Sequence, residues 1–258
     1  MKLGLPDRLA AGATTGEQLA EALQLSAPHL IRVLRGLCTI GICEELAGGS
    51  FALTQAGQSL TTGSPSRLAE KVQIVVEQYW QPWANLAAII ETGKPAFAQI
   101  FGTTVFDWRD RNEEQGALFD SYLAKEAFAQ GGPIVEALDC SGVRTIADIG
   151  GGYGGLLAAI LQAHPNLAGI LFDRPHTIEA ASSFLGSQGV ADRVQRLGGG
   201  DAEAAAILRN CRSAMPDGAK LAIIERPLPE RATDDPAPIM LDLHMMTITG
   251  GRGAWFNS

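Results

Sequence analysis

A six-residue run at positions 150–155, Gly-Gly-Gly-Tyr-Gly-Gly, constrains this chain more than any other feature. The apolar stretch 145–149 before it predicts a short buried strand, and residues 156–164 after it predict a helix. The first, third and sixth residues of the run satisfy the spacing G-x-G-x-x-G. Glycines in a strand–turn–helix unit let the backbone approach a ligand closely, and the helix start offers free N–H groups. The run therefore predicts a ligand-binding turn in an α/β fold.

The chain from residue 143 onward alternates between strand-like and helix-like segments. Strands are expected at 145–149, 168–173, around 194 and 220–225, and helices at 156–164, 176–186 and 202–215. Repeating strand–helix units form a parallel, doubly wound sheet, which binds ligands at the carboxyl ends of its strands. We therefore expect the α/β class for this half of the chain.

Two aspartates lie at the expected binding edge of this sheet. Asp173 ends the second strand, where it can bind both hydroxyls of a ribose; alternatively, it caps the helix that begins near Pro175. Asp148 stands just before the first glycine, where a carboxylate would repel the pyrophosphate of a dinucleotide. S-adenosylmethionine has no phosphate and carries sulfonium and ammonium groups, so Asp148 favours this cofactor over NAD. The alternative for Asp148 is that it only binds backbone amides of the loop.

Residues 9–60 predict two helices followed by a hairpin, which together make a winged helix. Thr14 and Thr15, with Glu17 and Gln18, form a capping-box pattern, and Ser26 is placed to cap the second helix. The hairpin is expected from two short strand-like segments at 42–46 and 51–53. A winged helix binds either DNA or another protein. The formal net charge of −8 and the pI of about 5.0 favour the protein-binding alternative.

The middle of the chain predicts long helices at 66–92 and 112–138. Much of the aromatic content lies in or near them, in residues 79–83 and at Phe97, Phe101, Phe106 and Trp108. These side chains either line a pocket for a flat substrate or form core. The predicted domain organisation is 1–92, a winged-helix dimerisation domain; 93–142, a helical linker and substrate-pocket region; and 143–258, the cofactor-binding domain.

Composition and short motifs exclude several other classes of protein. The sequence contains no run of 18 apolar residues, so no membrane span is expected, and the first residues show no secretory signal. Cys38 and Cys43 have no second pair of ligands at metal-binding spacing, so no metal is expected. The scattered cysteines fit a reducing compartment, and we expect the protein in the cytoplasm.

Several segments resemble one family, the caffeate/acetylserotonin-type S-adenosylmethionine-dependent O-methyltransferases and their bacterial natural-product relatives. The first motif, 143–154, and the segment 171–176, which is similar to "FDLPHV", carry the resemblance; so do 5–10, 51–54, 206–211, 224–226 and 241–246. The resemblance implies an intertwined homodimer formed by the winged helix. It also implies a set of cofactor-binding residues. Gly150, Gly151 and Gly152, together with Asp148, would face the methionine part, and Asp173 would bind the ribose. Arg174 is also expected to bind the cofactor, and Asp201 to lie near the adenine.

The chain departs from the family where the catalytic base is expected. Relatives carry a His in an "LHDW" motif that deprotonates the substrate hydroxyl, whereas residues 194–200 here run straight into Asp201. On the order of 30 residues, one helix–strand unit with its loops, have no counterpart. The resemblance leaves Glu225 as a supporting acid and His244 as a weak substitute base. Gly253 replaces a second supporting acid, and the last strands of the family sheet have no matching sequence.

The sequence therefore predicts an incomplete doubly wound domain behind a winged helix. The expected function is S-adenosylmethionine-dependent O-methylation of a small hydroxylated aromatic or polyketide-like molecule, impaired by the absent base. The alternatives are a non-catalytic cofactor-binding or dimer-partner homologue, an NAD-binding oxidoreductase, and a winged-helix DNA-binding regulator. No nucleic acid and no membrane are expected as partners.

Overall fold

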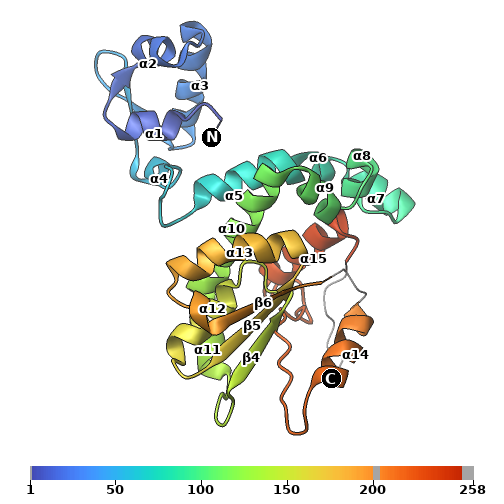
Figure 1. Cartoon of the computed structure of the whole chain (residues 1–258). Helices are drawn as coiled ribbons and strands as arrows, with labels where there is room; N and C mark the ends of the chain where they lie inside the picture. Colours follow the sequence, from blue (N-terminus) through green and yellow to red (C-terminus); the bar gives the residue numbers. More distant parts are fainter. Residues whose placement is uncertain (1, 200–203, 252–258) are drawn as a thin grey trace. The chain divides into compact units, whose positions relative to one another are not determined.

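A computed structural model describes residues 2–199 and 204–251 of the 258-residue chain (Figure 1). The chain divides into two compact units, residues 1–80 and residues 81–258. Each unit is described by itself. No helix among the described residues is long and apolar enough to cross a membrane.

The N-terminal unit combines short helices with a small antiparallel sheet. Its elements are α1 (Leu5–Ala10), β1 (Thr14–Thr15), α2 (Gly16–Leu23), α3 (Ala27–Thr39), β2 (Cys43–Glu45), β3 (Ser50–Leu53), α4 (Gln55–Gln58), α5 (Leu68–Ile74) and the π-helix η1 (Val75–Tyr79). The strand order is β1-β3-β2, with both pairs antiparallel. The predicted hairpin is thus confirmed, and β1 is an addition that the sequence did not indicate.

Local capping explains the start of α2 but not that of α3. Thr15 accepts a hydrogen bond from the backbone N–H of Gln18, and the Gln18 side chain accepts one from the N–H of Thr15, which confirms the capping box. Ser26 precedes α3 but makes no capping bond to the backbone; its hydroxyl lies 2.7 Å from Nδ1 of His29 instead. Leu34 and Phe51 are almost completely buried and join the helices to the sheet.

The predicted long helices are each broken in the structure. Residues 66–92 form α5, η1, α6 (Trp80–Ala84) and α7 (Leu86–Thr92), and Asn85 leaves the helical conformation. Residues 112–138 form α10 (Glu113–Gln130) and α11 (Gly132–Ala137). Pro133 ends the ladder of backbone hydrogen bonds that runs along α10, because its nitrogen has no hydrogen to donate. Between these segments lie α8 (Ala96–Phe101) and α9 (Val105–Arg111).

The second unit contains the expected parallel sheet. Strands β4 (Thr145–Ile149), β5 (Ala168–Asp173) and β6 (Val194–Gly198) pair in the order β4-β5-β6, which confirms the strand–helix alternation over this part. The connections are α12 (Gly155–Ala163) and α13 (Pro175–Ser187), with a short 3-10 turn at Ala191–Arg193. Helices α14 (Ala204–Ala214) and α15 (Pro236–Ile248) follow.

The strand predicted at 220–225 is wrong. This segment is extended and exposed, and within the described residues β4 is an edge of the sheet (Figure 1). The apolar side chains Leu221, Ile223 and Ile224 are about half exposed or more. Apolar periodicity favours a strand, but a strand forms only when a partner supplies its ladder of hydrogen bonds.

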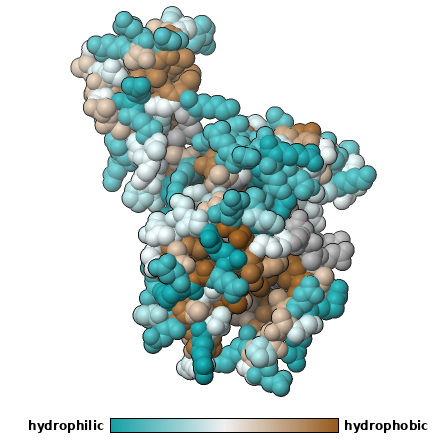
Figure 2. Space-filling model, viewed as in Figure 1, coloured by the Kyte–Doolittle hydropathy of each residue, from teal (hydrophilic) through white to brown (hydrophobic). Residues whose placement is uncertain are grey.

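The two faces of this sheet differ in burial. Leu171 is fully buried among residues of α12 and α13, such as Leu157 and Leu185. The opposite face presents a row of three apolar side chains, Ile149, Phe172 and Leu197, that are opposite one another in register. Ile149 is 42% exposed and Leu197 is 41% exposed. Figure 2 shows apolar residues reaching the surface of this unit, in keeping with the partial exposure of Ile149 and Leu197.

Candidate cofactor site

The glycine loop between β4 and α12 adopts a backbone that other residues disfavour. Gly150, Gly152 and Gly154 have φ of 75°, 58° and 82°. Side chains at these positions would be strained, because L-residues rarely adopt positive φ. No atom lies within 4 Å of where a Cβ of Gly150 or Gly152 would stand, so the loop is not covered by side chains there.

Other glycines of the run are required by close packing. A Cβ on Gly151 would lie 2.5 Å from Oδ2 of Asp148 and 2.6 Å from Cδ1 of Leu171. A Cβ on Gly155 would lie 2.0 Å from the carbonyl oxygen of Ala124, which belongs to α10. The missing side chains thus let the loop settle onto the end of the sheet and let α12 pack directly against α10.

Asp173 joins the two loops at the carboxyl ends of β4 and β5. Its Oδ2 accepts a hydrogen bond of 2.8 Å from the backbone N–H of Gly152, and its Oδ1 accepts one of 2.7 Å from the N–H of Arg174. A carboxylate oxygen can accept more than one hydrogen bond, so this geometry leaves acceptor capacity for hydroxyl groups. The carboxylate is directed at the glycine turn, as a ribose-binding acid requires.

Asp148 lies beneath the same loop. The backbone N–H of Leu157, in the first turn of α12, acts on this carboxylate and lowers its pKa, against the larger effect of burial. This contact supports the alternative that Asp148 binds backbone amides. Burial, and secondarily the negative charge of Asp173, raises the pKa of Asp148 to about 6. A cation bound at the loop would favour its ionised form.

These residues fit a cationic adenosine compound. The loop offers uncovered backbone at Gly150 and Gly152, and two carboxylates converge on it. Positive groups of the ligand would offset the repulsion between the carboxylates, whereas a pyrophosphate would increase it. The chemistry of the site therefore fits S-adenosylmethionine better than a dinucleotide.

Arg174 turns its side chain away from the loop toward α9. Its guanidinium is paired with Asp110 and lies 3.5 Å from Oδ1 of Asp107. His176 Nε2 lies 3.0 Å from the other oxygen of Asp110. The side chains of the loop after β5 are thus tied to α9, a relationship that no sequence pattern indicated.

His244 pairs with Trp83 on α6. The indole Nε1–H donates a hydrogen bond of 3.1 Å to His244 Nδ1, and the two rings are nearly parallel, with an interplanar angle of 17°. Burial, followed by the positive charge of Arg109, lowers the pKa of His244. The other expected catalytic residue, Glu225, is exposed on the extended segment, and Asp201 lies outside the described residues.

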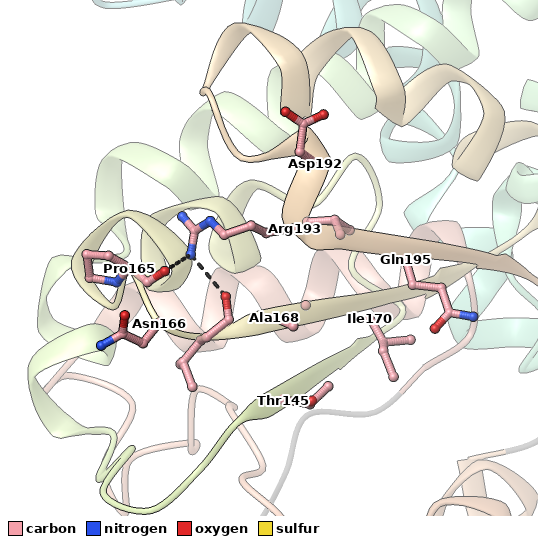
Figure 3. Close-up of a pocket in the computed structure, with 11 residues that line it drawn as sticks. Thr145, Pro165, Asn166, Ala168, Ile170, Asp192, Arg193 and Gln195 are labelled. Carbon is pink, nitrogen blue, oxygen red and sulfur yellow. Dashed lines mark hydrogen bonds between the residues drawn. The ribbon is translucent and has the colours of Figure 1, made fainter.

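A hollow lies at the end of the sheet opposite to the glycine loop. Figure 3 shows it at the amino ends of the strands, beside Thr145, Ala168 and Gln195. The Arg193 guanidinium there donates to four backbone carbonyls, those of Leu161, His164, Pro165 and Leu167. Arg193 thus binds the carboxyl end of α12 and the loop after it. This hollow is separate from the glycine loop.

Comparison with known proteins places the chain in a family. The family model described as an O-methyltransferase domain matches residues 83–203. A phenazine O-methyltransferase of Lysobacter antibioticus is 35% identical over 97% of this chain and 80% of the relative. The chain belongs to the O-methyltransferase family. An O-demethylpuromycin O-methyltransferase of Streptomyces alboniger is 33% identical over 97% of this chain and 74% of that protein.

A solved structure of this O-methyltransferase family identifies the cofactor that the family binds. A neocarzinostatin-biosynthesis O-methyltransferase, solved with S-adenosylhomocysteine and 1,4-dihydroxy-2-naphthoic acid, is 26% identical to the chain. It superposes with a TM-score of 0.82, covering 98% of this chain and 84% of that one. The family uses S-adenosylmethionine, and close homologues act on small aromatic natural products. These findings do not favour the nicotinamide alternative.

The alignment with the phenazine O-methyltransferase is longer than this chain. The match to the phenazine O-methyltransferase spans 274 positions, more than the 258 residues of this chain. Part of the relative inside the aligned range therefore has no counterpart here.

Proposed function

We propose that the glycine loop and the ends of β4 and β5 bind S-adenosylmethionine. Gly150, Gly151, Gly152 and Asp148 would face the methionine part, and Asp173 the ribose. The hydrogen bond from Gly152 to Asp173 carries this assignment, because it brings the Asp173 carboxylate against the backbone that would approach the ligand. Two assignments from the family resemblance belong to this proposal as well: Arg174 beside the ribose, with its side chain paired to Asp110 on α9, and Asp201, outside the described residues, near the adenine.

The acceptor in this proposal is a small hydroxylated aromatic or polyketide-like molecule. The dihydroxynaphthoate in the related structure supports this class. Phe97 is fully buried and packs edge-on against Trp108, which favours the core alternative for these rings. Trp83 and His244 are better placed to touch an acceptor, because both are only partly buried and lie on helices of the same unit.

We propose further that methyl transfer is slow in this chain. Bound S-adenosylmethionine supplies the electrophilic methyl group, and the protein must remove a proton from the acceptor hydroxyl. The absence of the family's "LHDW" motif from the sequence supports this proposal. Trp83 can only donate, so its hydrogen bond holds His244 in the tautomer protonated at Nε2. In that tautomer the lone pair on Nδ1 already accepts from the indole, so it is not presented to an acceptor hydroxyl, and Glu225 is exposed.

The N-terminal unit is proposed to be a winged-helix dimerisation domain, giving a homodimer. The order of α2, α3 and the β2–β3 hairpin supports the winged helix. Arg35, one of two arginines on α3, donates to both carboxylate oxygens of Glu45 on β2. Glu45 offsets a positive charge that DNA binding would use. The domain boundaries predicted at residues 92 and 142 remain part of this proposal.

Binding and turnover are tested separately. Isothermal titration with S-adenosylhomocysteine should show binding by the wild-type chain and its loss in Asp173→Ala. Transfer of labelled methyl from S-adenosylmethionine to dihydroxynaphthoic and phenolic acceptors should be far slower than in a relative with the His base. Absence of binding contradicts the cofactor assignment, whereas rapid turnover contradicts only the impairment.

Oligomeric state is the third measurement. Light scattering after size exclusion should give twice the mass of the 27.2 kDa chain. A monomer, or DNA binding that weakens steeply with salt, would contradict the dimerisation role.

A further inference from the structure

The turn between β5 and α13 carries the residue that orients the Asp173 carboxylate. Oδ1 of Asp173 accepts its 2.7 Å hydrogen bond from the backbone N–H of Arg174, while Oδ2 accepts from Gly152. Arg174 directly precedes Pro175, where α13 begins, and has φ of −59° and ψ of 145°. A residue before proline has few other conformations open to it. The position of the Arg174 peptide therefore decides where the Asp173 carboxylate points.

The side chain of Arg174 is held by two acids of α9. Its guanidinium is paired with Asp110 and lies 3.5 Å from Oδ1 of Asp107. The side chain of Asp110 is 30% exposed, whereas that of Asp107 is 47% exposed. Exposed ion pairs contribute little because water screens them, and charge-assisted hydrogen bonds shielded from water contribute more. Asp110 is therefore the stronger of the two acidic anchors.

Asp110 also contacts the first turn of α13. Its Oδ1, which is shielded from solvent, lies 3.0 Å from Nε2 of His176. The same nitrogen lies 3.1 Å from the hydroxyl of Thr177. The two oxygens of one carboxylate thus contact the residues on either side of Pro175, where the chain changes from strand to helix. Two contacts fix this turn more firmly than one, because each removes freedom that the other leaves.

Helix α9 is itself fixed to its surroundings. The hydroxyl of Thr104 donates a 2.8 Å hydrogen bond to Oδ2 of Asp107 and accepts one of 3.1 Å from the Asp107 N–H, which caps the start of the helix. The Trp108 ring packs against two rings of α8, with centroids 5.8 Å from Phe97 and 5.5 Å from Phe101. A carboxylate on this helix therefore has a defined place from which to hold the turn.

We propose that Asp110 is a positioning residue for the cofactor, which holds the turn after β5 against α9 and thereby aims the Asp173 carboxylate at the glycine loop. The inference rests on the proposed cofactor site, in which Asp173 binds the ribose. Each step of the path is an ion pair or a hydrogen bond. The steps run from Asp110 to the Arg174 side chain, from the Arg174 backbone to Asp173, and from Asp173 to Gly152.

The first test follows the backbone amide of Gly152 in the unliganded protein. Because this N–H donates to Asp173, its proton resonance reports whether the carboxylate is in place. Asp110→Asn should move the signal upfield, since a neutral amide holds the guanidinium less firmly. Arg174→Gln removes the other half of the pair and should move the signal in the same direction. Asp192→Asn, which changes an exposed aspartate at the other end of the sheet, is the control and should leave it in place.

The second test is calorimetric titration with S-adenosylhomocysteine. Asp110→Asn should weaken binding about tenfold, a coupling typical of residues that act through a neighbour. In an Arg174→Gln background the same substitution should cost about twofold or less, because only the contact with His176 is left to lose. In an Asp148→Asn background the tenfold cost should be retained, since Asp148 is not part of the path. Near-ultraviolet circular dichroism verifies that each variant keeps the fold.

The results separate this inference from the proposed function. If wild type binds no S-adenosylhomocysteine, the cofactor site fails, and the Gly152 signal still decides whether Asp110 positions Asp173. If wild type binds and Asp110→Asn binds equally well, the positioning role alone is overturned. A loss of affinity that leaves the Gly152 signal unmoved, or that persists in full in the Arg174→Gln background, also overturns it, because Asp110 would then act by another route.

Discussion

The backbone N–H of Gly152 donates a 2.8 Å hydrogen bond to Oδ2 of Asp173, which joins the loop after β4 to the end of β5. Asp173→Ala removes this bond together with the proposed acceptor of the ribose hydroxyls. We expect a loss of about 2–4 kcal/mol in S-adenosylhomocysteine binding, roughly 30- to 1,000-fold. Calorimetry measures it, with Asp192→Ala as the control. Unchanged affinity would show that the ligand lies elsewhere.

Gly151 leaves no room for a side chain. Gly151→Ala would force a methyl group to within 2.6 Å of the Asp148 carboxylate and of Leu171, so we expect about 1–3 kcal/mol of destabilisation with weaker cofactor binding. Gly186→Ala is the matched control, because Gly186 is helical, exposed and has no atom within 4 Å of its Cβ position. That change should stabilise by about 0.5–1 kcal/mol. Urea unfolding compares the two, and equal effects would refute the packing argument.

Asp148 makes the stability of the unliganded protein depend on pH. Its folded pKa of about 6 lies above the ordinary value of 3.8, so the folded state binds more protons between these values. This contribution to stability is present below pH 3.8 and is lost as pH rises through 6. Asp148→Asn should therefore raise the melting temperature at pH 7.5 but not at pH 3.5, while weakening S-adenosylmethionine binding. A gain of equal size at both pH values would contradict the assignment to burial of charge.

The Trp83–His244 pair should be visible by nuclear magnetic resonance. Burial lowers the pKa of His244 below its ordinary value of 6.5, and the indole donor adds to this by binding the neutral ring. Trp83→Phe removes that donor and should raise the pKa of His244. Histidine Cε1 proton shifts followed from pH 4 to 9 provide the measurement, with His244→Gln to assign the signal. A His244 pKa at or above 6.5 in wild type would contradict the pairing.

The two faces of the sheet should respond differently to truncation. Leu171 is fully buried, so Leu171→Ala should cost about 2–5 kcal/mol. Leu197 is 41% exposed on the other face, and Leu197→Ala should cost about 1 kcal/mol or less. Chemical denaturation of both variants gives the comparison. Comparable losses would mean that the second face is covered in solution.

Short-range features of the sequence determined the local structure well. The glycine run, the strands on either side of α12 and the capping box at Thr15 all follow from spacings within a few residues. Asp148 and Asp173 could be placed because the carboxyl ends of adjacent parallel strands meet at one edge. These relationships need only local geometry and the rule that successive βα units pair.

Tertiary structure alone decided the rest. The pairing of Trp83 with His244 could not be predicted, because the two residues lie 161 positions apart in the sequence. The segment 220–225 has the apolar pattern of a strand, yet it remains extended and exposed and leaves Glu225 away from any sheet. Periodicity specifies which side chains seek burial, whereas only the assembled fold supplies the hydrogen-bonding edge and the charged neighbours that turn a residue into part of a site.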